Sequence, residues 1–483
     1  MAHQVTGCKR LHKSDAFAMG AEQGTGKTWM LLEDAEARFR RNEIDAVLII
    51  APNGVHVNWI TREIPKHLSA PCAATFWVSG PTKRQQAALA RQIAHAKDEP
   101  RRLIIHAMNI DAVNTKGGYA HAEKFIDTFG FDRTAIIVDE SHTIKNPVAK
   151  RTMRAVALGR LCRVRRIASG TLVANSPLDL FSQYDFLAQG LLGTRSYRAF
   201  VAEFAELLTA DSRLVQDIVQ RTGARGTPQI VARNADGTPR FKNLEKLGAM
   251  MAPHTFRVTK EECLDLPEKI YQTRFFELDA EQRRAYDRVV DEHNWLRADG
   301  EIDIFTALTV ITKLRQITSG FILENGIPTS LAHAGPRLAA LEEALEDYPG
   351  PTIIWASFNE EIAQIAAMLR KRGETFREYY GAISKRDREA AINDFQNGQA
   401  RIFLGNPAAA GTGLTLTKAE TAIYYSCDFS LVKRSQSEDR SHRIGTLHHV
   451  VYMDLVASDT IDERIAAALQ IKAGTAALIM SKL

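Results

Sequence analysis

The sequence predicts an α/β protein in which two doubly wound parallel sheets are joined by a mainly helical middle segment. Short apolar runs recur between helical stretches in the first 190 residues, and a second series of such runs begins near Pro351. Short continuous apolar runs are typical of parallel strands buried on both faces. Their alternation with helices is typical of a doubly wound sheet.

The predicted elements follow in order along the chain. The first series of strands lies at 17–19, 46–51, 75–78, 103–105, 135–138 and 166–168, and the second at 352–355, 401–404, 421–425 and 450–455. The spacing of Leu31, Ala35 and Phe39 predicts a helix after the first strand. Between the two series, 280–298 and 305–317 have helical patterns, and 234–237 is expected to form a turn. We therefore expect a first lobe at 1–190, a helical insert and linker at 191–330, and a second lobe at 331–483.

The composition excludes several classes of protein. The chain has 483 residues, 45% of them hydrophobic and 25% charged, which are ordinary globular values and not those of a disordered chain or a fibrous repeat. Its five cysteines are dispersed without metal-ligand spacing, which is typical of reduced thiols. It has no apolar run of about 20 residues and no signal-peptide pattern, so we expect a cytoplasmic protein without a membrane partner. A net charge of +5 is compatible with a polyanionic partner but does not require one.

A glycine-rich segment lies between the first predicted strand and the helix after it. It runs Ala21-Glu-Gln-Gly24-Thr25-Gly26-Lys27-Thr28, which is the context that a phosphate-binding loop requires. Gly24, Thr25 and Gly26 would bring backbone N–H groups to the phosphates, and the helix N-terminus would favour their charge. Lys27 would reach the β- and γ-phosphates of ATP, and the hydroxyl of Thr28 would bind Mg²⁺.

Two carboxylates follow the buried strand at 135–138. Asp139 stands where it could hold Mg²⁺, and Glu140 where it could orient the attacking water. Parallel sheets bind ligands at the carboxyl ends of their strands, so this strand end can face the phosphate loop. Acidic residues after a strand also form ordinary turns, and it is the nearby phosphate loop that favours a magnesium site.

Several motifs together resemble those of superfamily-two helicases, and of their Swi/Snf branch in particular. They include Asp139-Glu-Ser-His142 followed by Lys145-Asn146, Pro52 with Asn58-Trp59 and Glu63, and Ser169-Gly-Thr171. The resemblance implies two RecA-like lobes, a Walker A loop and a DEAH-like box, with ATP and Mg²⁺ as ligands. It also implies that Gln4 reads the adenine. The sequence departs from the usual pattern at Ser141, where Ala is common, and at Leu172, where Pro is common.

A further segment, Gln436 to Gly445, resembles the sixth motif of the same family. Arg440 and Arg443 are three residues apart, so we expect them on one helical face. A charge run alone is more typical of a solvated helix, but the order of residues favours a catalytic role at the γ-phosphate for both arginines and a nucleotide contact for Gln436. An arginine finger is commonly worth about 10³ to 10⁵ in rate. Lys27 and Arg443 are expected in different lobes, so hydrolysis would require the lobes to close.

The resemblance also implies contacts with a nucleic-acid backbone from both lobes. The candidates are Pro52, Asn58, Lys145, Ser357, Arg388, Thr412 and Gly413. Such contacts carry little sequence specificity. Taken singly, each of these residues fits an ordinary strand–helix turn better than a nucleic-acid contact. The basic residues of the insert, among them Arg221, Arg225, Arg233, Arg240 and Lys246, fit either a duplex contact or a solvated surface.

The leading hypothesis is an ATP hydrolase that translocates on double-stranded DNA, is stimulated by DNA, and remodels DNA or protein–DNA complexes. One alternative is a strand-separating helicase on DNA or RNA, although the sequence shows no obvious wedge hairpin. The other is a catalytically silent nucleic-acid-binding scaffold, which intact Lys27, Asp139 and Glu140 disfavour. We expect a monomer whose specificity comes from a partner protein, in a bacterial or viral setting, or in the nucleus of a eukaryote.

Overall fold

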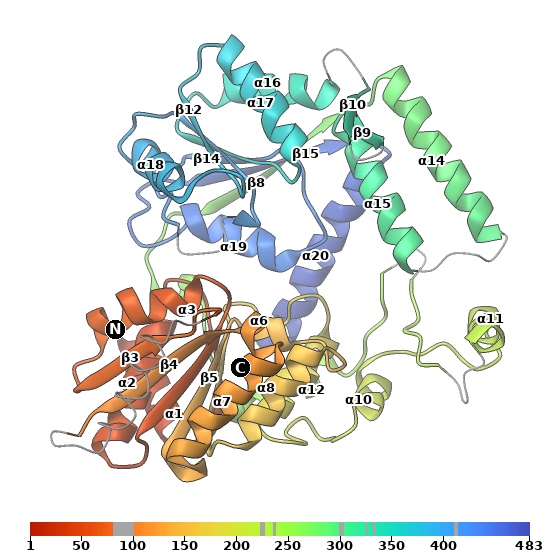
Figure 1. Cartoon of the computed structure of the whole chain (residues 1–483). Coiled ribbons are helices and arrows are strands. Elements are labelled where there is room, and N and C mark those ends of the chain that lie inside the picture. The colour runs from red at the N-terminus through yellow and green to blue at the C-terminus, as the bar shows by residue number, and fades with distance from the viewer. Residues whose placement is uncertain are drawn as a thin grey trace. The chain divides into compact units, whose positions relative to one another are not determined.

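The chain folds into two compact units, the first comprising 1–264 and 472–483 and the second comprising 265–471 (Figure 1). A computed structural model describes residues 1–80, 101–222, 228–234, 238–298, 304–324, 327–331, 335–409 and 414–483. Each unit is built around its own sheet, and every strand pair in both sheets is parallel. The predicted fold class, two doubly wound parallel lobes, is confirmed.

The first unit contains a seven-stranded sheet in the order β3-β4-β2-β5-β6-β1-β7. Its strands are β1 (Ala16–Ala21), β2 (Ala46–Ala51), β3 (Cys72–Phe76), β4 (Leu103–Asn109), β5 (Thr134–Asp139), β6 (Val164–Ala168) and β7 (Thr255–Val258). Because the strands are parallel, the carboxyl ends of β1, β2, β5 and β6 lie at one edge of the sheet. The phosphate loop, the segment of Pro52, the Asp139–Glu140 pair and the segment of Ser169 each follow one of these strand ends, whereas Gln4 lies before the first strand.

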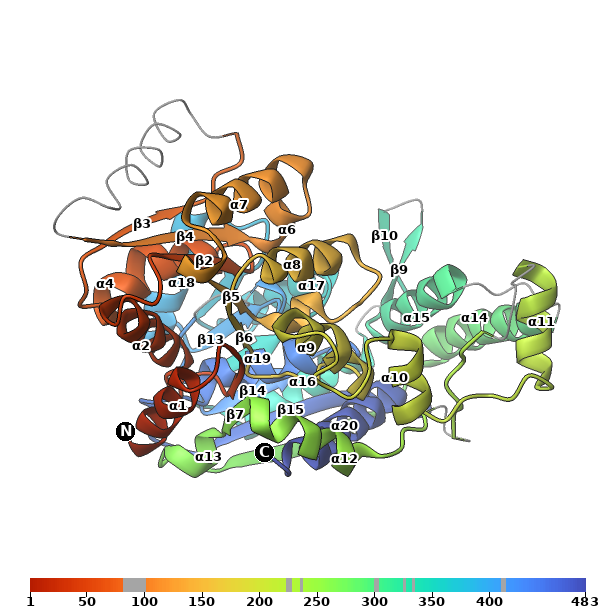
Figure 2. The same ribbon diagram turned by 90° about the horizontal axis from the view of Figure 1, so that it is seen from below.

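Helices cover both faces of this sheet. The longer helices of this unit are α1 (Ala2–His12), α2 (Lys27–Arg40), α7 (Lys116–Phe129), α8 (Lys150–Arg160), α9 (Leu180–Leu187), α10 (Tyr197–Phe204), α11 (Arg213–Thr222) and α12 (Leu244–Met251), of which α11 does not pack on the sheet. The short ones are α3 (Val55–Asn58), η1 (Trp59–Glu63), α4 (Ile64–His67), α6 (Ile110–Val113), η3 (Phe131–Arg133), η4 (Ser141–Ile144), η5 (Pro177–Asp179), η6 (Ala252–His254) and α13 (Lys260–Cys263). Figure 2 shows α1, α2 and α4 on one side of the strands and α7, α8 and α9 on the other.

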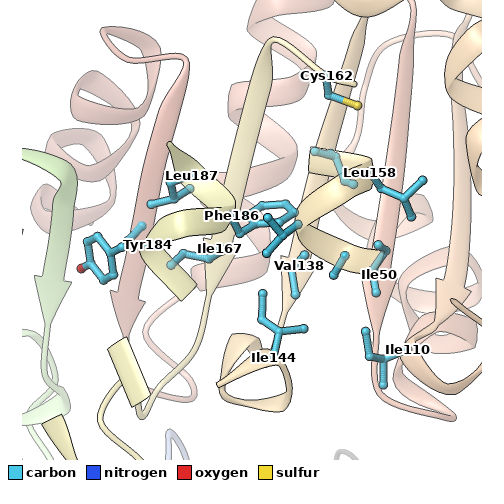
Figure 3. Close-up of a cluster of buried hydrophobic side chains, with 14 of the residues drawn as sticks. Ile50, Ile110, Val138, Ile144, Leu158, Cys162, Ile167, Tyr184, Phe186 and Leu187 are labelled. Carbon is cyan, nitrogen blue, oxygen red and sulfur yellow. The ribbon is translucent and has the colours of Figure 1, made fainter. Parts of the chain in front are cut away.

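The core under α8 and α9 holds the strand ends in place. Figure 3 shows Val138 of β5 and Ile167 of β6 beside Phe186 of α9 and Leu158 of α8, and all four side chains are buried. Burial of each such side chain contributes roughly 1.5–3 kcal/mol relative to leaving it in water. Asp139, one residue after Val138, is therefore presented from a rigid strand.

Buried arginines hold the end of α1 in place, just before β1 begins. Arg166 donates through Nε to Asp34 Oδ2 (2.9 Å) and through Nη2 to the carbonyl of Leu11 (3.0 Å). Arg38 donates through Nη2 to the same carbonyl (3.2 Å) and to that of Ser14 (2.8 Å). Since these carbonyls lie at and just after the end of α1, the arginines tie α1, with its Gln4, to α2 and β6.

The second unit contains a six-stranded sheet in the order β12-β13-β11-β14-β15-β8. Its strands are β8 (Lys269–Phe276), β11 (Thr352–Trp355), β12 (Phe376–Tyr379), β13 (Ile402–Gly405), β14 (Thr421–Tyr424) and β15 (Val450–Ala457). Its helices are α14 (Ala280–Ala298), α15 (Ile304–Thr318), α16 (Pro336–Asp347), α17 (Asn359–Lys371), α18 (Lys385–Gln396) and α19 (Leu431–Ser441), and α20 (Ile461–Met480) runs from this unit into the first. Buried side chains of α16 and α17 fill one face of the sheet, and those of α18 fill the other.

The middle segment contributes to both units, since it supplies the edge strand β7 to one sheet and the edge strand β8 to the other. The compact units therefore divide at 264/265, whereas the boundaries at 190/191 and 330/331 stay a prediction about sequence segments.

An antiparallel hairpin, β9 (Phe321–Glu324) with β10 (Ile327–Ser330), was not expected from the sequence. Of the predicted turn at 234–237, residues 235–237 lie outside the described part, and Asn234 N–H donates to the carbonyl of Thr238 beside it (2.8 Å). Within the described residues, no helix combines the length and the apolar character needed to cross a membrane.

Candidate active site

The phosphate loop occupies the connection between β1 and α2, as predicted. Gly24 and Gly26 have φ angles of 87° and 93°, which only glycine adopts without strain. Gly26 is the N-cap of α2, so the loop leads straight into the first N–H groups of the helix. Thr25 is buried and its hydroxyl donates to the carbonyl of Glu22 (2.9 Å), which makes Thr25 an anchor of the loop.

Lys27 lies beside the two carboxylates that follow β5. Its Nζ is 4.0 Å from Asp139 Oδ1 and 3.9 Å from Glu140 Oε1, although Lys27 and Asp139 are 112 positions apart. Burial raises the pKa of Asp139 above its usual value, and the charge of Glu140 adds to this, while Lys27 and the indole N–H of Trp59 oppose it. The structure thus brings together the amine and both acids that the sequence assigned to ATP hydrolysis.

Glu140 is held in an uncommon conformation by its neighbours. Its φ of 50° lies in the left-handed region, which a non-glycine residue occupies only when its surroundings impose it. Ser169, at the end of β6, donates to Glu140 Oε2 (3.3 Å), and His142 Nδ1 is 3.3 Å from the same oxygen. The Glu140 carboxylate is therefore oriented by the Ser169–Thr171 segment, a role that the sequence had not assigned to Ser169.

Trp59 bonds to Asp139, a contact that the sequence analysis did not foresee. Its indole N–H donates to Asp139 Oδ2 (2.9 Å), and its side chain is 1% exposed. Trp59 stands at the start of η1, shortly after the loop of Pro52. It therefore fixes the second carboxylate oxygen of Asp139 and ties that loop to it. The Asn-Trp pair was visible in the sequence, but nothing there pointed to a partner 80 positions away.

The start of α1 packs on the phosphate loop. His3 Nε2 is 2.8 Å from the carbonyl of Thr25, and a Cβ added at Gly26 would stand 2.1 Å from Gln4 Nε2. Gln4 is thus adjacent to the nucleotide loop, as a residue that binds the nucleotide should be, and its contact with adenine stays a prediction.

The donor set fits Mg²⁺ in the presence of a nucleotide. Thr28 lies in the first turn of α2 and Asp139 at the end of β5, which gives one hydroxyl and one carboxylate. Across the described residues no group of three or more His, Cys, Asp and Glu side chains could hold a metal ion. Mg²⁺ commonly takes one or two protein oxygens and completes its shell with phosphates and water. Thr28 and Asp139 are therefore sufficient candidates.

The predicted backbone-binding residues of the first unit follow β2 and β5. Pro52 begins a tight turn, with its carbonyl accepting from the N–H groups of Val55 (3.1 Å) and His56 (3.3 Å), and Asn58 ends α3. Lys145 follows η4, and its Nζ is 3.9 Å from Asp179 Oδ2. These residues stand at the same sheet edge as the phosphate loop.

The two arginines of the second unit do not share a helical face, which corrects our expectation. Arg440 is buried in the last turn of α19, but the helix ends at Ser441, so Arg443 lies beyond it. The hydroxyl of Thr446 donates to the carbonyl of Ser441 (2.6 Å) and accepts from the N–H of Arg443 (3.2 Å), which turns the chain away from the helix axis. Arg443 donates through Nη1 to the carbonyl of Leu414 (3.1 Å).

The remaining predicted residues of the second unit are placed as follows. Gln436 is partly buried on α19, and the guanidinium of Arg388 on α18 lies 5.9 Å from the ring centre of Tyr379. The hydroxyl of Ser357 donates to the carbonyl of Ser426 (3.3 Å), so it would have to exchange that bond to bind a phosphate. Thr412 and Gly413 lie outside the described residues. Lys27 belongs to the first unit and Arg443 to the second, and their approach to one another stays a prediction.

Buried ion pairs hold α19 to its sheet. Glu438 accepts from Lys269 of β8 (2.9 Å) and from Arg434 (2.8 Å), whose guanidinium lies 3.6 Å from the ring centre of Tyr424. Burial alone would raise the pKa of Glu438, but the two cations hold it below its usual value. The helix that presents Gln436 and Arg440 is therefore rigidly anchored.

The positive charge of the basic insert is partly neutralised, since Arg240 pairs with Glu206 (2.7 Å) and Lys246 with Glu203 (2.7 Å).

Comparisons with known proteins agree with this architecture. Residues 8–320 match the family model of the SNF2-related domain, and residues 336–445 match that of the helicase conserved C-terminal domain. The putative ATP-dependent helicase/translocase YwqA of Bacillus subtilis is 26% identical over 437 residues, which cover 88% of this chain and 42% of YwqA. The TATA-binding protein-associated factor mot1 of Aspergillus fumigatus is 27% identical over 394 residues, which cover 72% of this chain and 20% of mot1. The chain thus spans less than half the length of these relatives.

Among solved structures, the Sulfolobus solfataricus SWI2/SNF2 ATPase core in complex with dsDNA is similar to this chain. The sequence identity is 23% and the TM-score 0.40, with 99% of this chain and 92% of that chain covered. The family models bear more weight, since the first of them alone matches more than half of the residues. The resemblance stated from the motifs is confirmed, and the chain belongs to the SNF2-related family of helicase-like ATP hydrolases.

Proposed function

We propose that this chain is an ATP-dependent translocase on double-stranded DNA, which hydrolyses ATP to ADP and phosphate and remodels DNA or protein–DNA complexes. The observation that carries the proposal is the position of Lys27, with its amine within 4.0 Å of both Asp139 and Glu140 at the N-terminus of α2. A relative named as an ATP-dependent helicase/translocase supports the same activity.

The residues of the first unit divide the chemistry among them. The amine of Lys27 and the N–H groups at the start of α2 bind the β- and γ-phosphates. Mg²⁺, held by Thr28 and Asp139, would neutralise charge on the phosphate oxygens. Glu140, oriented by Ser169, directs a water at the γ-phosphorus, and the bond from that phosphorus to the β,γ-bridging oxygen breaks. The water proton leaves through Glu140, and the products are ADP and phosphate.

Arg440 and Arg443 supply positive charge to the γ-phosphate from the second unit. Because they belong to a different unit from Lys27, hydrolysis requires the units to approach, and this requirement couples the reaction to motion. Pro52, Asn58 and Lys145 on one unit, and Ser357, Arg388, Thr412 and Gly413 on the other, would hold the DNA backbone. Alternate approach and separation of the two sets would then move the chain along the duplex.

The setting of the activity is part of the proposal. Backbone contacts give little sequence preference, so a partner protein would direct a monomeric motor to its target. The relatives come from a bacterium and a fungus, among others, and we place the protein in the cytoplasm, or in the nucleus if its source is eukaryotic.

The hairpin of β9 and β10 favours a second candidate function, strand separation. Leu323 and Ile327 on its two strands are 47% and 68% exposed. Apolar side chains on an exposed hairpin could stack on a base pair and separate the strands of a fork. A forked substrate with one labelled strand therefore belongs in the same experiment.

The decisive assay compares the ATPase rate with duplex DNA, single-stranded DNA, forked DNA and RNA at one fixed salt concentration, because backbone binding falls steeply as salt rises. We expect stimulation by duplex DNA, displacement of a third strand from a triplex, and no release of the labelled fork strand. Lys27→Ala and Glu140→Gln should abolish turnover, and Glu140→Gln should still bind ATP. Lys116→Ala is the matched control, since Lys116 also opens a helix of the first unit but is exposed.

Two outcomes would count against the proposal. Equal rates of ATP hydrolysis with and without any nucleic acid would refute the proposed translocase activity. Fork unwinding without triplex displacement would favour the helicase. Binding of a slowly hydrolysed ATP analogue with no turnover on any nucleic acid would favour the silent scaffold.

A further inference from the structure

A buried glutamine of α9, Gln183, bonds to the turn that carries Glu140. The hydroxyl of Ser141 donates to Gln183 Oε1 (2.7 Å), and both residues are fully buried. The amide Nε2 of Gln183 donates to the carbonyl of Leu172 (2.8 Å) and to that of Asp179 (2.9 Å). The Gln183 amide therefore uses both of its N–H groups and its oxygen on three separate segments.

The direction of these hydrogen bonds is fixed by chemistry. A backbone carbonyl can only accept, so the two carbonyls of Leu172 and Asp179 must face the amide nitrogen. A flipped amide would place its oxygen against both of them. The oxygen therefore faces Ser141, whose hydroxyl has to donate.

These bonds close a ring around the catalytic carboxylate. Ser169 bonds to the side chain of Glu140, and three residues later Leu172 bonds through Gln183 to Ser141, the residue after Glu140. The segment from Ser169 to Leu172 is thus fastened to the Glu140 turn at two points. One point fixes the carboxylate, and the other fixes the backbone that bears it in its left-handed conformation.

The link depends on a feature of this chain. Ser141 stands where alanine is usual in the motif it resembles, and an alanine has no hydroxyl to offer. A hydroxyl or an amide buried without a partner costs about 1–3 kcal/mol, so Ser141 and Gln183 each need the other.

We propose that Gln183 is a positioning residue for Glu140, which sets the carboxylate for the attacking water through Ser141 and through the segment that ends at Leu172. This rests on the proposed function, since it gives Glu140 its role in hydrolysis. Gln183 itself touches neither ATP nor water in the reaction.

The first arm of the test measures the link without any turnover. Amide hydrogen exchange is followed at Thr143, whose N–H donates to the carbonyl of Glu140 (2.9 Å), and at Thr171, whose N–H donates to Ser169 Oγ (3.0 Å). We expect Gln183→Leu to speed exchange at both amides and to leave the amides of β5 unchanged. The control is Tyr184→Phe, which removes a buried hydroxyl from the neighbouring position of α9, where it bonds to Thr255. It should leave both amides as in the wild type.

The second arm measures ATP hydrolysis with saturating duplex DNA. Gln183→Leu removes all three hydrogen bonds of the amide and should lower kcat at least about tenfold, with KM for ATP within about twofold, since the loss of even one such bond corresponds to about a factor of ten. Ser141→Ala should lower kcat by less, and the double variant should be no slower than Gln183→Leu, because the two residues act through one bond. Tyr184→Phe should keep the wild-type kcat even if its melting temperature falls.

Several results would overturn the role of Gln183. They are unchanged exchange at Thr143 and Thr171, a kcat of Gln183→Leu close to wild type, multiplied losses in the double variant, or an equal loss in Tyr184→Phe. If Gln183→Leu does not fold, Ser141→Ala decides alone, since it removes only the hydroxyl. An inactive wild type would refute the proposed function, whereas the exchange arm would still decide whether the link holds the Glu140 turn.

Discussion

Acidification should destabilise the first unit through a buried histidine, His106 of β4. Its side chain is 2% exposed, with Nδ1 2.9 Å from Thr75 Oγ1 and Nε2 3.1 Å from His121 Nε2. Burial lowers its pKa to about 3, and the neighbouring His121 and His56 act in the same direction. His106 is therefore neutral in the folded unit at any pH well above about 3.

The sign of the effect follows from the two pKa values. In the unfolded chain the histidine has its ordinary pKa of about 6.5 and takes up a proton as the pH falls below that value. In the folded unit it does so only near a pH of about 3. Stability is therefore complete above pH 6.5 and is lost as the pH falls from there toward 3. At pH 5 the loss is about 2 kcal/mol from His106 alone, since each pH unit below the ordinary pKa corresponds to 1.36 kcal/mol. This is a large part of a typical domain stability of about 5–15 kcal/mol.

The assay is urea-induced unfolding of the whole chain at pH 7, 6 and 5, with pulse-labelled hydrogen exchange in β4 as the measure of the first unit. His106→Gln should lower by about one the number of protons taken up on unfolding between pH 7 and 5. His67→Gln, at a more exposed histidine of α4, is the control for replacing a histidine elsewhere in the first unit. An identical loss between pH 7 and 5 in His106→Gln and in the wild type would refute the role of His106.

Three further changes test other parts of the first unit. Gly26→Ala should abolish ATP binding, measured by calorimetry, because the φ of 93° at the N-cap of α2 strains any residue with a Cβ and that Cβ would displace the side chain of Gln4; near-wild-type binding would contradict this. Trp59→Phe should lower kcat about tenfold with the fold intact, since Asp139 loses an N–H donor. Unchanged kinetics would show that this hydrogen bond does not contribute to hydrolysis. Phe186→Ala should destabilise the first unit by about 3–5 kcal/mol in urea unfolding, and a loss under 1 kcal/mol would show that the core beneath β5 and β6 collapses around the gap.

The central strands of both sheets could be predicted from the sequence. Of the four edge strands, only β3 was predicted in part, at 75–78, and β7, β8 and β12 were not. β2 was predicted at 46–51 and is observed at Ala46–Ala51, and β11 is likewise observed where it was predicted. β12 (Phe376–Tyr379) carries Arg377 and Glu378, and β8 has mostly exposed side chains. An edge strand pairs with a neighbouring strand on one side only, and its side chains are less completely covered than those of a central strand. Its sequence therefore lacks the continuous apolar run that reveals a central strand.

The parts of the site that adjoin a strand end were predictable, because chain order and parallel topology suffice to place them. Lys27, Asp139 and Glu140 meet for that reason. The position of Arg443 was not predictable, since a spacing of three residues places two side chains on one face only if the helix continues, and here the hydroxyl of Thr446 bonds to the carbonyl of Ser441 and turns the chain.

The polar contacts behind the site show where such reasoning can be extended. A hydroxyl at a buried position has to find an acceptor or a donor, so a polar residue where a motif usually carries an apolar one predicts a second polar residue nearby. Ser141 is such a residue, and its partner Gln183 lies 42 positions further along the chain on a helix that is otherwise almost wholly buried. The sequence alone predicts that Ser141 has a polar partner but does not identify it. Only the packing of α9 against the end of β5 shows that the partner is Gln183 and not another glutamine of the chain.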